Sequence, residues 1–429
     1  MICVALLRLT QLSRPIYWPR LWFKEERTAP RRNRKADTRI DPSRARQVTE
    51  DAHVHPASID APKSDSHLQD LTPTWPPPGA DTPLRSRIVV LNYNRRGLLA
   101  ECLPSIVAAA AAATDRTRVS VVDNSSTDGS VEYLRREWPE VEVFQEPNRG
   151  LVSYNAVLGR VAEPVVFLLN NDVKLDAGFV DPLVAVFERD PECFLAGPLC
   201  WRFDGTTYEG MRTHVRIHRG LVQASVRFPG YERSIHEPGF TAAVGPVLAV
   251  DREKFLALGG YDSLYLPGRL EDLDLGYRAW LAGWKAYYVP EAVAYHKGFG
   301  TFHDAYGVEG CDLLALRNTL LFMWKNIRDA RHLVRHLVAL PCRAAHSVLS
   351  ALWVPRQRRF LFLRALFAAI PRLPAAVVGG GIASRLTAGM AGAQSNAASA
   401  RRQRRQVVRF ASIGDRTAAE RAFFARFRW

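Results

Sequence analysis

The sequence lacks the cysteine and glycine patterns that mark several common protein classes. No Cys-x-x-Cys pair occurs, so neither a zinc site nor a disulfide framework is indicated. We expect the six cysteines to be small buried residues in a reducing compartment; they are Cys3, Cys102, Cys193, Cys200, Cys311 and Cys342. No Gly-x-Gly-x-x-Gly opens the first predicted helix and no Gly-x-x-x-x-Gly-Lys-Ser/Thr occurs, which argues against a Rossmann dehydrogenase and a P-loop enzyme.

Long apolar runs are absent as well. No stretch reaches about 18 uninterrupted apolar residues, so no membrane-spanning helix is predicted. The apolar run within residues 1–12 is short and contains Arg8. Arg14 and Pro15 follow it in place of a small-residue cleavage site, so we predict no secretory signal peptide.

Acidic residues become scarce toward the C-terminus. From Lys325 to Trp429, twenty Lys and Arg residues stand against three acidic ones, a net charge of +17. The whole chain carries +15, which leaves about −2 for everything before Lys325. The basic character therefore belongs to the C-terminal part, and we expect it to have a partner of its own.

Composition and periodicity divide the 429 residues into four regions. Residues 1–84 are rich in basic residues and proline and lack periodicity, so we predict a disordered segment. We expect a folded α/β domain over 85–310, a helical region over 311–385 and a basic tail over 386–429.

The α/β domain shows a repeated strand, polar loop and helix. Apolar strands are predicted at 88–91, 118–122, 141–145 and from Val165, and each ends on polar residues. This order predicts a doubly wound, mostly parallel sheet, with the polar loops gathered at its carboxyl edge. There we expect a crevice containing Asn92, Asp123, Asp128, Asn148 and Asp172.

The run Asn170-Asn171-Asp172 ends the fourth strand. Carboxylate and amide oxygens suit Mg²⁺ or Mn²⁺. By itself, however, this run is equally typical of a plain polar turn.

Taken together, seven segments resemble the family 2 glycosyltransferases, inverting enzymes of the GT-A fold, over about residues 87–326. They read Val-Leu-Asn-Tyr-Asn-Arg (90–95), Val-Val-Asp-Asn-Ser-Ser-Thr-Asp-Gly (121–129), Asn-Arg-Gly (148–150), Leu-Asn-Asn-Asp (169–172), Gly-Gly-Tyr-Asp (259–262), Glu-Asp-Leu-Asp-Leu-Gly-Tyr-Arg (271–278) and Tyr-His (295–296). The chain lacks the Gln-x-x-Arg-Trp of processive relatives, so the similarity is to the non-processive, rhamnosyltransferase-like branch and implies transfer of a single sugar.

The resemblance implies roles for particular residues. Asp123 and Asp128 would hold the base and ribose of a UDP- or dTDP-sugar, and Asp172 with His296 would bind Mn²⁺ or Mg²⁺. Further donor-binding residues would be Asn92, Asn94, Asn148, Gly150, Asn155, Asn170 and Asn171. Asn170 replaces the first carboxylate of the family's Asp-x-Asp motif, which weakens the expected metal affinity. Without the resemblance, His296 is more typical of a core histidine after a strand.

Asp272 is the expected catalytic base, with Glu271 as its neighbour and Asp274 as a structural residue. Arg278 is expected to pair with one of these acids. An acid near a helix N-terminus is also a plain capping arrangement, although that accounts less readily for three acids in four residues.

Residues 201–250 are expected to form an insert of strands that faces the acceptor. His214 and His218 have the spacing of a helical metal pair, but they alternate with apolar residues, which favours a solvated strand face.

Phe360 to Ile370 is apolar with arginines around it, typical of a helix in a membrane interface or of one packed on the domain. The cluster Arg401 to Arg405 favours anionic lipid over nucleic acid.

These patterns predict a cytoplasmic enzyme at the inner face of the membrane, acting in cell-wall or polysaccharide biosynthesis. It would move one sugar from a nucleotide-diphosphate sugar to a glycan or lipid-linked acceptor. A sugar nucleotidyltransferase and a non-catalytic sugar-nucleotide-binding protein remain the alternatives.

Overall fold

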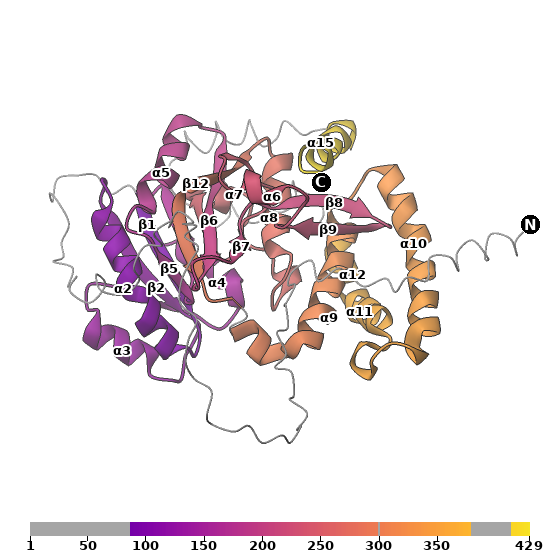
Figure 1. The fold of residues 1–429 in the computed structure, drawn as a ribbon, viewed down its shortest axis with the longest axis horizontal. Coiled ribbons are helices and arrows are strands. Elements are labelled where there is room, and N and C mark those ends of the chain that lie inside the picture. Colours follow the sequence, from indigo (N-terminus) through magenta and orange to yellow (C-terminus); the bar gives the residue numbers. More distant parts are fainter. Residues whose placement is uncertain (1–85, 299–300, 379–412) are drawn as a thin grey trace, which may run out of the picture. The chain divides into compact units, whose positions relative to one another are not determined.

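A computed structural model of the chain describes residues 86–298, 301–378 and 413–429 (Figure 1). The predicted disordered segment 1–84 and the cluster from Arg401 to Arg405 lie outside the described residues. Of the cysteines within them, four are buried as expected, whereas Cys342 is exposed.

One mixed sheet forms the centre of the described domain. Its main strands are β1 (Ser86–Asn92), β2 (Thr117–Asp123), β3 (Glu142–Gln145), β4 (Val165–Asn170), β6 (Cys193–Arg202), β10 (Gly239–Phe240), β11 (Val247–Asp251) and β12 (Lys285–His296). They are ordered β10-β12-β6-β11-β4-β1-β2-β3. The pairs β4–β1, β1–β2, β2–β3 and β12–β6 are parallel, whereas β11 is antiparallel to both of its neighbours. The predicted doubly wound, mostly parallel sheet is confirmed.

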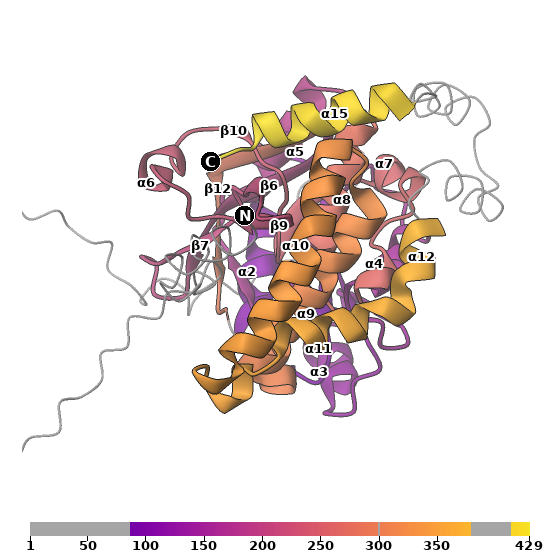
Figure 2. The same ribbon diagram turned by 90° about the vertical axis from the view of Figure 1, so that its right-hand side faces the viewer.

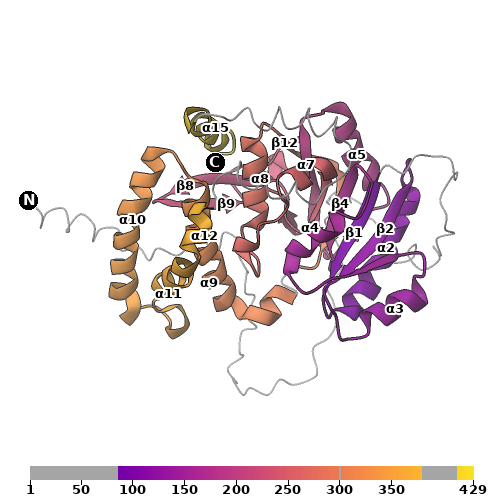
Figure 3. The same ribbon diagram turned by 180° about the vertical axis from the view of Figure 1, so that it is seen from behind.

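Helices cover both faces of this sheet (Figures 1 and 3). On one face lie α2 (Arg96–Ala112), α3 (Ser130–Glu137) and α5 (Val180–Arg189). On the other face lie α4 (Ser153–Leu158), α7 (Arg252–Ala257) and α8 (Glu271–Leu281). The unbroken apolar run of β4 follows from this arrangement, because its first five residues are buried between the two helical layers.

Parallel pairing aligns the strand ends that carry polar residues. Asn92 stands opposite Asp123, and Leu91 stands opposite Asn170. The loops after β1, β2 and β4 therefore start side by side at one edge of the sheet, as predicted.

The insert between β6 and β11 contains short strands, including β7 (Tyr208–Gly210) and a hairpin of β8 (His214–His218) and β9 (Leu221–Ser225). The strand prediction for His214 and His218 is confirmed, so the two side chains do not have the helical spacing of a metal pair.

A helical region follows the sheet. It contains α9 (Thr301–Asn326, interrupted at Gly307), α10 (Ala330–Leu349), α11 (Leu361–Ala369) and α12 (Leu373–Val378). Helices α11 and α12 pack against α9, and α11 buries Phe362, Ala365 and Ala369. The expectation of no potential spanning segment needs correction: Leu361–Val378 has a mean hydropathy of 1.7 and is long and apolar enough by these measures alone.

Of the expected basic tail over 386–429, the structure describes only residues 413–429, and these contain a helix. Helix α15 (Ile413–Arg426) packs against α8 and β8 (Figure 2). Phe423 and Phe427 contact Trp280 edge-on, and the backbone N–H of Val215 donates to the carbonyl of Phe427. The carboxylate of Glu420 is fully buried and accepts hydrogen bonds from the backbone N–H groups of Arg328 and Asp329.

We expect Phe423→Ala to lower the free energy of unfolding by about 3–5 kcal/mol, because this ring is buried among aromatic neighbours. Phe367→Ala is the matched control: Phe367 is 67% exposed on α11, and its loss should change stability by no more than about 0.5 kcal/mol. Urea unfolding of both variants makes the comparison. Equal effects would show that α15 does not contribute to the folded domain.

Candidate functional site

The edge of the sheet is joined by a hydrogen-bond network centred on Asn92, which is fully buried. Its amide nitrogen donates to the Asp123 carboxylate (3.0 Å) and to Ser126 Oγ (3.2 Å), and its amide oxygen accepts from Asn171 Nδ2 (2.8 Å). Asp123 is also fully buried and accepts a hydrogen bond from the backbone N–H of Ser126. The structure thus unites three of the predicted residues, with Asp123 beneath the loop that it shapes.

The loops after β1 and β2 hold each other in place. Asn94 has a φ of 48°, which asparagine tolerates, and its side-chain oxygen accepts from the N–H of Thr127 (2.7 Å). Burial raises the pKa of Asp128, but the hydrogen bonds that it accepts from Ser130 and from the N–H of Arg96 together outweigh this effect and lower the pKa. Both predicted residues therefore support the rim of the crevice.

A third loop follows β3. Asn148 accepts from the N–H of Gly150, and Asn124 donates to the carbonyl of Gly150 (3.2 Å). Gly150 has a φ of 53°, and a Cβ there would lie 3.3 Å from the carbonyl oxygen of Pro267. Glycine is therefore required where this loop meets the segment before α8.

Asn155 has a positioning role in the structure. Its amide accepts from the N–H of Tyr261 and donates to the carbonyl of the same residue, both at 2.9 Å. These bonds attach α4 to the Gly259–Asp262 segment. The assignment of Asn155 to donor binding stays a prediction.

The backbone N–H of Asn170, at the end of β4, donates to the carbonyl of Pro246. Two residues later, Asp172 faces His296 at the end of β12. Asp172 Oδ1 lies 3.3 Å from His296 Nε2, and Glu209 Oε1 lies 3.4 Å from His296 Nδ1. Burial lowers the pKa of His296, but the two carboxylates outweigh it and raise the pKa to about 9. Burial raises the pKa of Asp172, but His296 outweighs this effect, and the pKa is lowered.

These side chains fit a divalent cation. A carboxylate and a neutral imidazole suit Mn²⁺, so a bound cation would replace the proton that the two carboxylates hold on His296. Asp172 Oδ1 is buried, and its contact with His296 Nε2 is an ion pair without hydrogen-bond geometry. Glu209 stands where a second carboxylate commonly orients a metal-binding histidine. Over the ranges described, no three His, Cys, Asp or Glu side chains form a metal-binding group, so a cation here would need further ligands. Glu209 was not predicted, because it comes from the insert and no local pattern marks it.

The start of α8 carries Glu271 and Asp272, both half-buried. Burial and then the charge of Asp272 raise the pKa of Glu271 to about 8. Burial also raises the pKa of Asp272, but the N–H of Leu273, 2.7 Å from its Oδ1, opposes this increase. Within the pair, the charge of Asp272 adds to the effect of burial on Glu271, so Glu271 is the acid that keeps its proton to higher pH. The N-cap position is Leu270, which has no capping side chain, so none of the three acids is the N-cap residue; Glu271, Asp272 and Asp274 all lie in the first turn, where a negative charge also suits the helix dipole.

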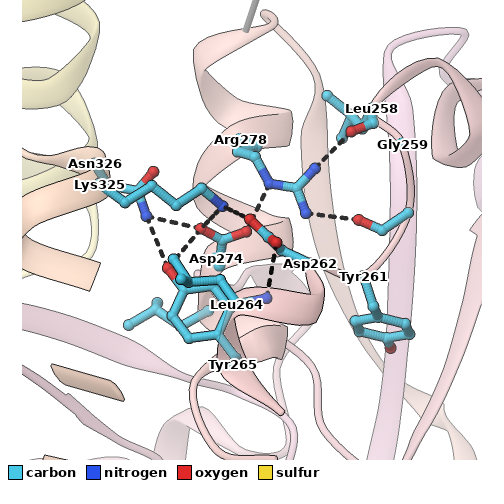
Figure 4. A network of polar contacts seen from close by, with 12 residues as sticks. Leu258, Gly259, Tyr261, Asp262, Leu264, Tyr265, Asp274, Arg278, Lys325 and Asn326 are labelled. Carbon is cyan, nitrogen blue, oxygen red and sulfur yellow. Dashed lines mark hydrogen bonds and ion pairs between the residues drawn. The ribbon is translucent and has the colours of Figure 1, made fainter. Parts of the chain in front are cut away.

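Asp274 lies in a buried network of charges (Figure 4). Its carboxylate accepts from Lys325 Nζ (2.5 Å), Arg278 Nε (2.7 Å) and the hydroxyl of Tyr265 (2.9 Å). Lys325 also pairs with Asp262 at 2.7 Å, so two cations balance two anions. Burial raises the pKa of Asp274, but the two cations outweigh it and lower the pKa far below the usual aspartate range. The prediction that Arg278 pairs with an acid is confirmed, and the buried network is consistent with the structural role predicted for Asp274.

The segment before α8 has strained backbone. Arg269 and Leu270 have φ values of 85° and 67°, a region that such residues rarely adopt. Asn318 of α9 holds this segment in place: its amide nitrogen lies 2.8–2.9 Å from the carbonyl oxygens of Tyr265, Gly268 and Arg269, which share its two hydrogens. No local sequence pattern marks Asn318, because its partners lie about 50 residues away.

We expect Asp274→Asn to cost about 3–5 kcal/mol of folding stability, because it leaves two buried cations facing one anion. The lowered pKa of Asp274 means that its stabilising effect is present above the usual aspartate range and is lost as pH falls. Urea unfolding at several pH values measures both effects. The free energy of unfolding of the variant should fall less as the pH is lowered than that of the unmodified chain. Asp312→Asn, which breaks the exposed pair with Arg358, is the control and should cost at most about 1 kcal/mol. If Asp274→Asn left the midpoint of the urea transition unchanged, the buried charge network would not contribute to folding stability.

Comparison with known proteins connects this site to a family. The family model for glycosyl transferase family 2 matches residues 87–245. The chain is 31% identical over 228 residues to the N-acetylglucosaminyl-diphospho-decaprenol L-rhamnosyltransferase of two Mycobacterium tuberculosis strains, CDC 1551 / Oshkosh and ATCC 25618 / H37Rv. The match covers 47% of this chain and 74% of that enzyme.

Solved structures are more distant. Mannosyltransferase PcManGT from Pyrobaculum calidifontis, in complex with GDP-Man and Mn²⁺, is 18% identical with a TM-score of 0.39 over 80% of this chain and 85% of its own. S. aureus TarS 1-349 is 14% identical with a TM-score of 0.41, covering 80% and 92%. GalNAc-T7 with UDP, GalNAc and Mn²⁺ is 22% identical with a TM-score of 0.40, and the match covers 49% of this chain and 43% of that one.

The sequence matches decide the family. Identity at this level over most of a rhamnosyltransferase means that the chain belongs to glycosyltransferase family 2.

Proposed function

We propose that this glycosyltransferase moves one sugar, with inversion, from a UDP- or dTDP-sugar to a lipid-linked glycan acceptor. The similarity to the rhamnosyltransferase favours L-rhamnose as the sugar and an N-acetylglucosaminyl-diphospho-polyprenol as the acceptor. An acceptor of this kind lies at the membrane surface, so we place the enzyme there, on the cytoplasmic side.

One observation carries the proposal: the three acids at the start of α8 have different environments. Asp274 forms ion pairs with Lys325 and Arg278, and Glu271 is protonated near neutral pH. Asp272 is the acid of the pair that loses its proton first, and its carboxylate is held by backbone N–H groups alone and not by a cation. Inverting transfer needs one base to take the proton of the attacking acceptor hydroxyl, and Asp272 has the properties of that base.

Two groups of residues at this edge of the sheet would bind different parts of the donor. The loops held by Asn92, Asn94, Asp123 and Asp128 form the side for the base and ribose. Asp123 shapes that side from beneath, since it has no exposed surface. Asn148, Gly150, Asn170 and Asn171 line the approach to the diphosphate and sugar.

Asp172 and His296 would hold Mn²⁺ or Mg²⁺, with Glu209 orienting the imidazole. The cation, when bound, would neutralise charge on the leaving diphosphate, whose oxygens could complete its ligands.

We expect Asp272→Asn to reduce turnover about 10²–10⁴-fold while donor affinity changes only a few-fold. Glu271→Gln is a matched control, since glutamine mimics the protonated acid expected at neutral pH, and it should lose less than about tenfold. Radiolabelled sugar transfer and donor binding by calorimetry measure the two quantities. If the two variants lost activity equally, or if Asp272→Asn kept normal turnover, Asp272 would not be the base.

We expect Asp123→Ala to weaken the binding of free UDP or dTDP even without metal, because it releases both Asn92 and the Ser126 loop. Asp172→Ala should weaken binding only when metal is present, because Asp172 faces His296 and not this loop. Calorimetry with and without a chelator separates them. Equal sensitivity of both variants to the chelator would contradict this division of roles.

The function itself is tested by supplying UDP-, dTDP- and GDP-sugars, each with a short-chain N-acetylglucosaminyl-diphospho-polyprenol, with and without Mn²⁺. Mass spectrometry should find one added sugar from a UDP- or dTDP-donor. Repeated additions, or use of GDP-sugars alone, would overturn the proposal.

A further inference from the structure

Helix α10 presents its apolar side to solvent. Seven large side chains on its outward face and just beyond its end are 52–80% exposed: Val334, Leu337, Val338, Val348, Leu349, Leu352 and Trp353. We call this set the outer stripe. Spacings of three and four residues place its α10 members on one side of the helix, and the exposed Pro341 and Ala345 continue the row between them.

The opposite side of α10 is polar and faces the protein. His336 is buried, accepts from Trp324 Nε1 (3.0 Å) and contacts the carbonyl oxygen of Gly220 through Nδ1 (2.7 Å). Arg343 donates to the carbonyl of Arg219 (3.2 Å). A Cβ on Gly220 would lie 2.5 Å from Ala339, so the β8–β9 turn packs directly on the helix. These contacts fix the rotation of α10, and the outer stripe cannot turn inward.

This orientation is the reverse of that of an ordinary surface helix, whose apolar side faces the core. At about 1.5 Å per residue, the row along α10 from Val334 to Leu349 extends roughly 22 Å, and Leu352 and Trp353 continue it beyond the helix. Figure 2 looks onto α10, and no other described element lies across it. An apolar row of this length on a surface marks a contact site for another apolar phase or protein.

Charge identifies the occupant. Residues 330–378 contain eight arginines and no aspartate or glutamate. Arg331 and Arg335 on α10, and Arg356 and Arg359 after it, are exposed. A second copy of the chain would bring these cations against one another, whereas an anionic bilayer would neutralise them. Nucleic acid would neutralise the charge but leave the outer stripe exposed.

Two further features suit a bilayer. Trp353, 80% exposed beside Leu352, belongs to a residue type that favours the boundary between lipid and water. The apolar segment Leu361–Val378 belongs to the same region and exposes Phe367 and Val378.

We propose that α10 lies in the surface of an anionic lipid bilayer, with the outer stripe inserted among the acyl chains and the arginines at the headgroups. This surface is distinct from the catalytic crevice and requires no particular donor or acceptor. The cluster from Arg401 to Arg405 lies outside the described residues and stays a separate prediction, whereas α15 is packed on the domain.

The test is sedimentation of the full chain with vesicles of phosphatidylcholine containing or lacking phosphatidylglycerol. We expect binding to the anionic vesicles that weakens with salt and that Leu349→Gln/Trp353→Gln reduces at least about tenfold. Tyr306→Gln/Val308→Gln, an exposed apolar pair on α9, is the matched control and should bind like the unmodified chain. Circular dichroism and UDP binding should be the same for all three proteins.

Normal vesicle binding by the outer-stripe variant would overturn the proposal. It would also be overturned if the unmodified chain formed a dimer that the variant lost while neither bound vesicles, which would assign the surface to a second copy. Binding equally strong to vesicles lacking phosphatidylglycerol would remove the role given to the arginines and overturn the anionic part of the proposal.

Discussion

The buried carboxylate of Asp274 determines where helix α8 lies, and with it the position of the proposed base two residues earlier. Lys325 reaches Asp274 from α9, and Arg278 connects the same carboxylate to the carbonyls of Leu258 and Gly260. Desolvating these four charges is costly, so the network is stable only when α8, α9 and the segment around Asp262 are all in place. The position of the proposed base therefore depends on α9, a helix that follows the last strand of the sheet in sequence.

Helix α9 links the proposed catalytic site to the region that contains the outer stripe. The amide of Asn318 contacts three carbonyl oxygens of the strained segment before α8, and Lys325 forms an ion pair with Asp274. The same helix supports α11 and α12, which belong to the acid-free region that includes the outer stripe. A rigid α9 would hold the crevice at a fixed position relative to a bilayer. This arrangement suits an acceptor whose lipid stays in the membrane while its sugar enters the site.

The sequence predicted the parts of this protein that depend on local pattern. Apolar runs located the strands, and chain order with right-handed crossovers placed their polar ends at one edge. Residues that act through distant contacts were missed, among them Glu209 beside His296 and Asn318 below the α8 segment. Helix α15 was also missed, because the arginine count hid the helical spacing of Glu420, Phe423 and Phe427. Asn155 carried a family motif, yet in the structure its amide pairs with the backbone of Tyr261.

The central claim is that one ionised carboxylate, Asp272, activates the acceptor for direct attack on the donor sugar. Direct attack inverts the configuration at the anomeric carbon, whereas a route through a covalent sugar–enzyme intermediate retains it. Nuclear magnetic resonance of the isolated product reports that configuration from the coupling of the anomeric carbon and proton. The account predicts the anomer opposite to that of the donor. A product with the donor's own anomeric configuration would contradict it.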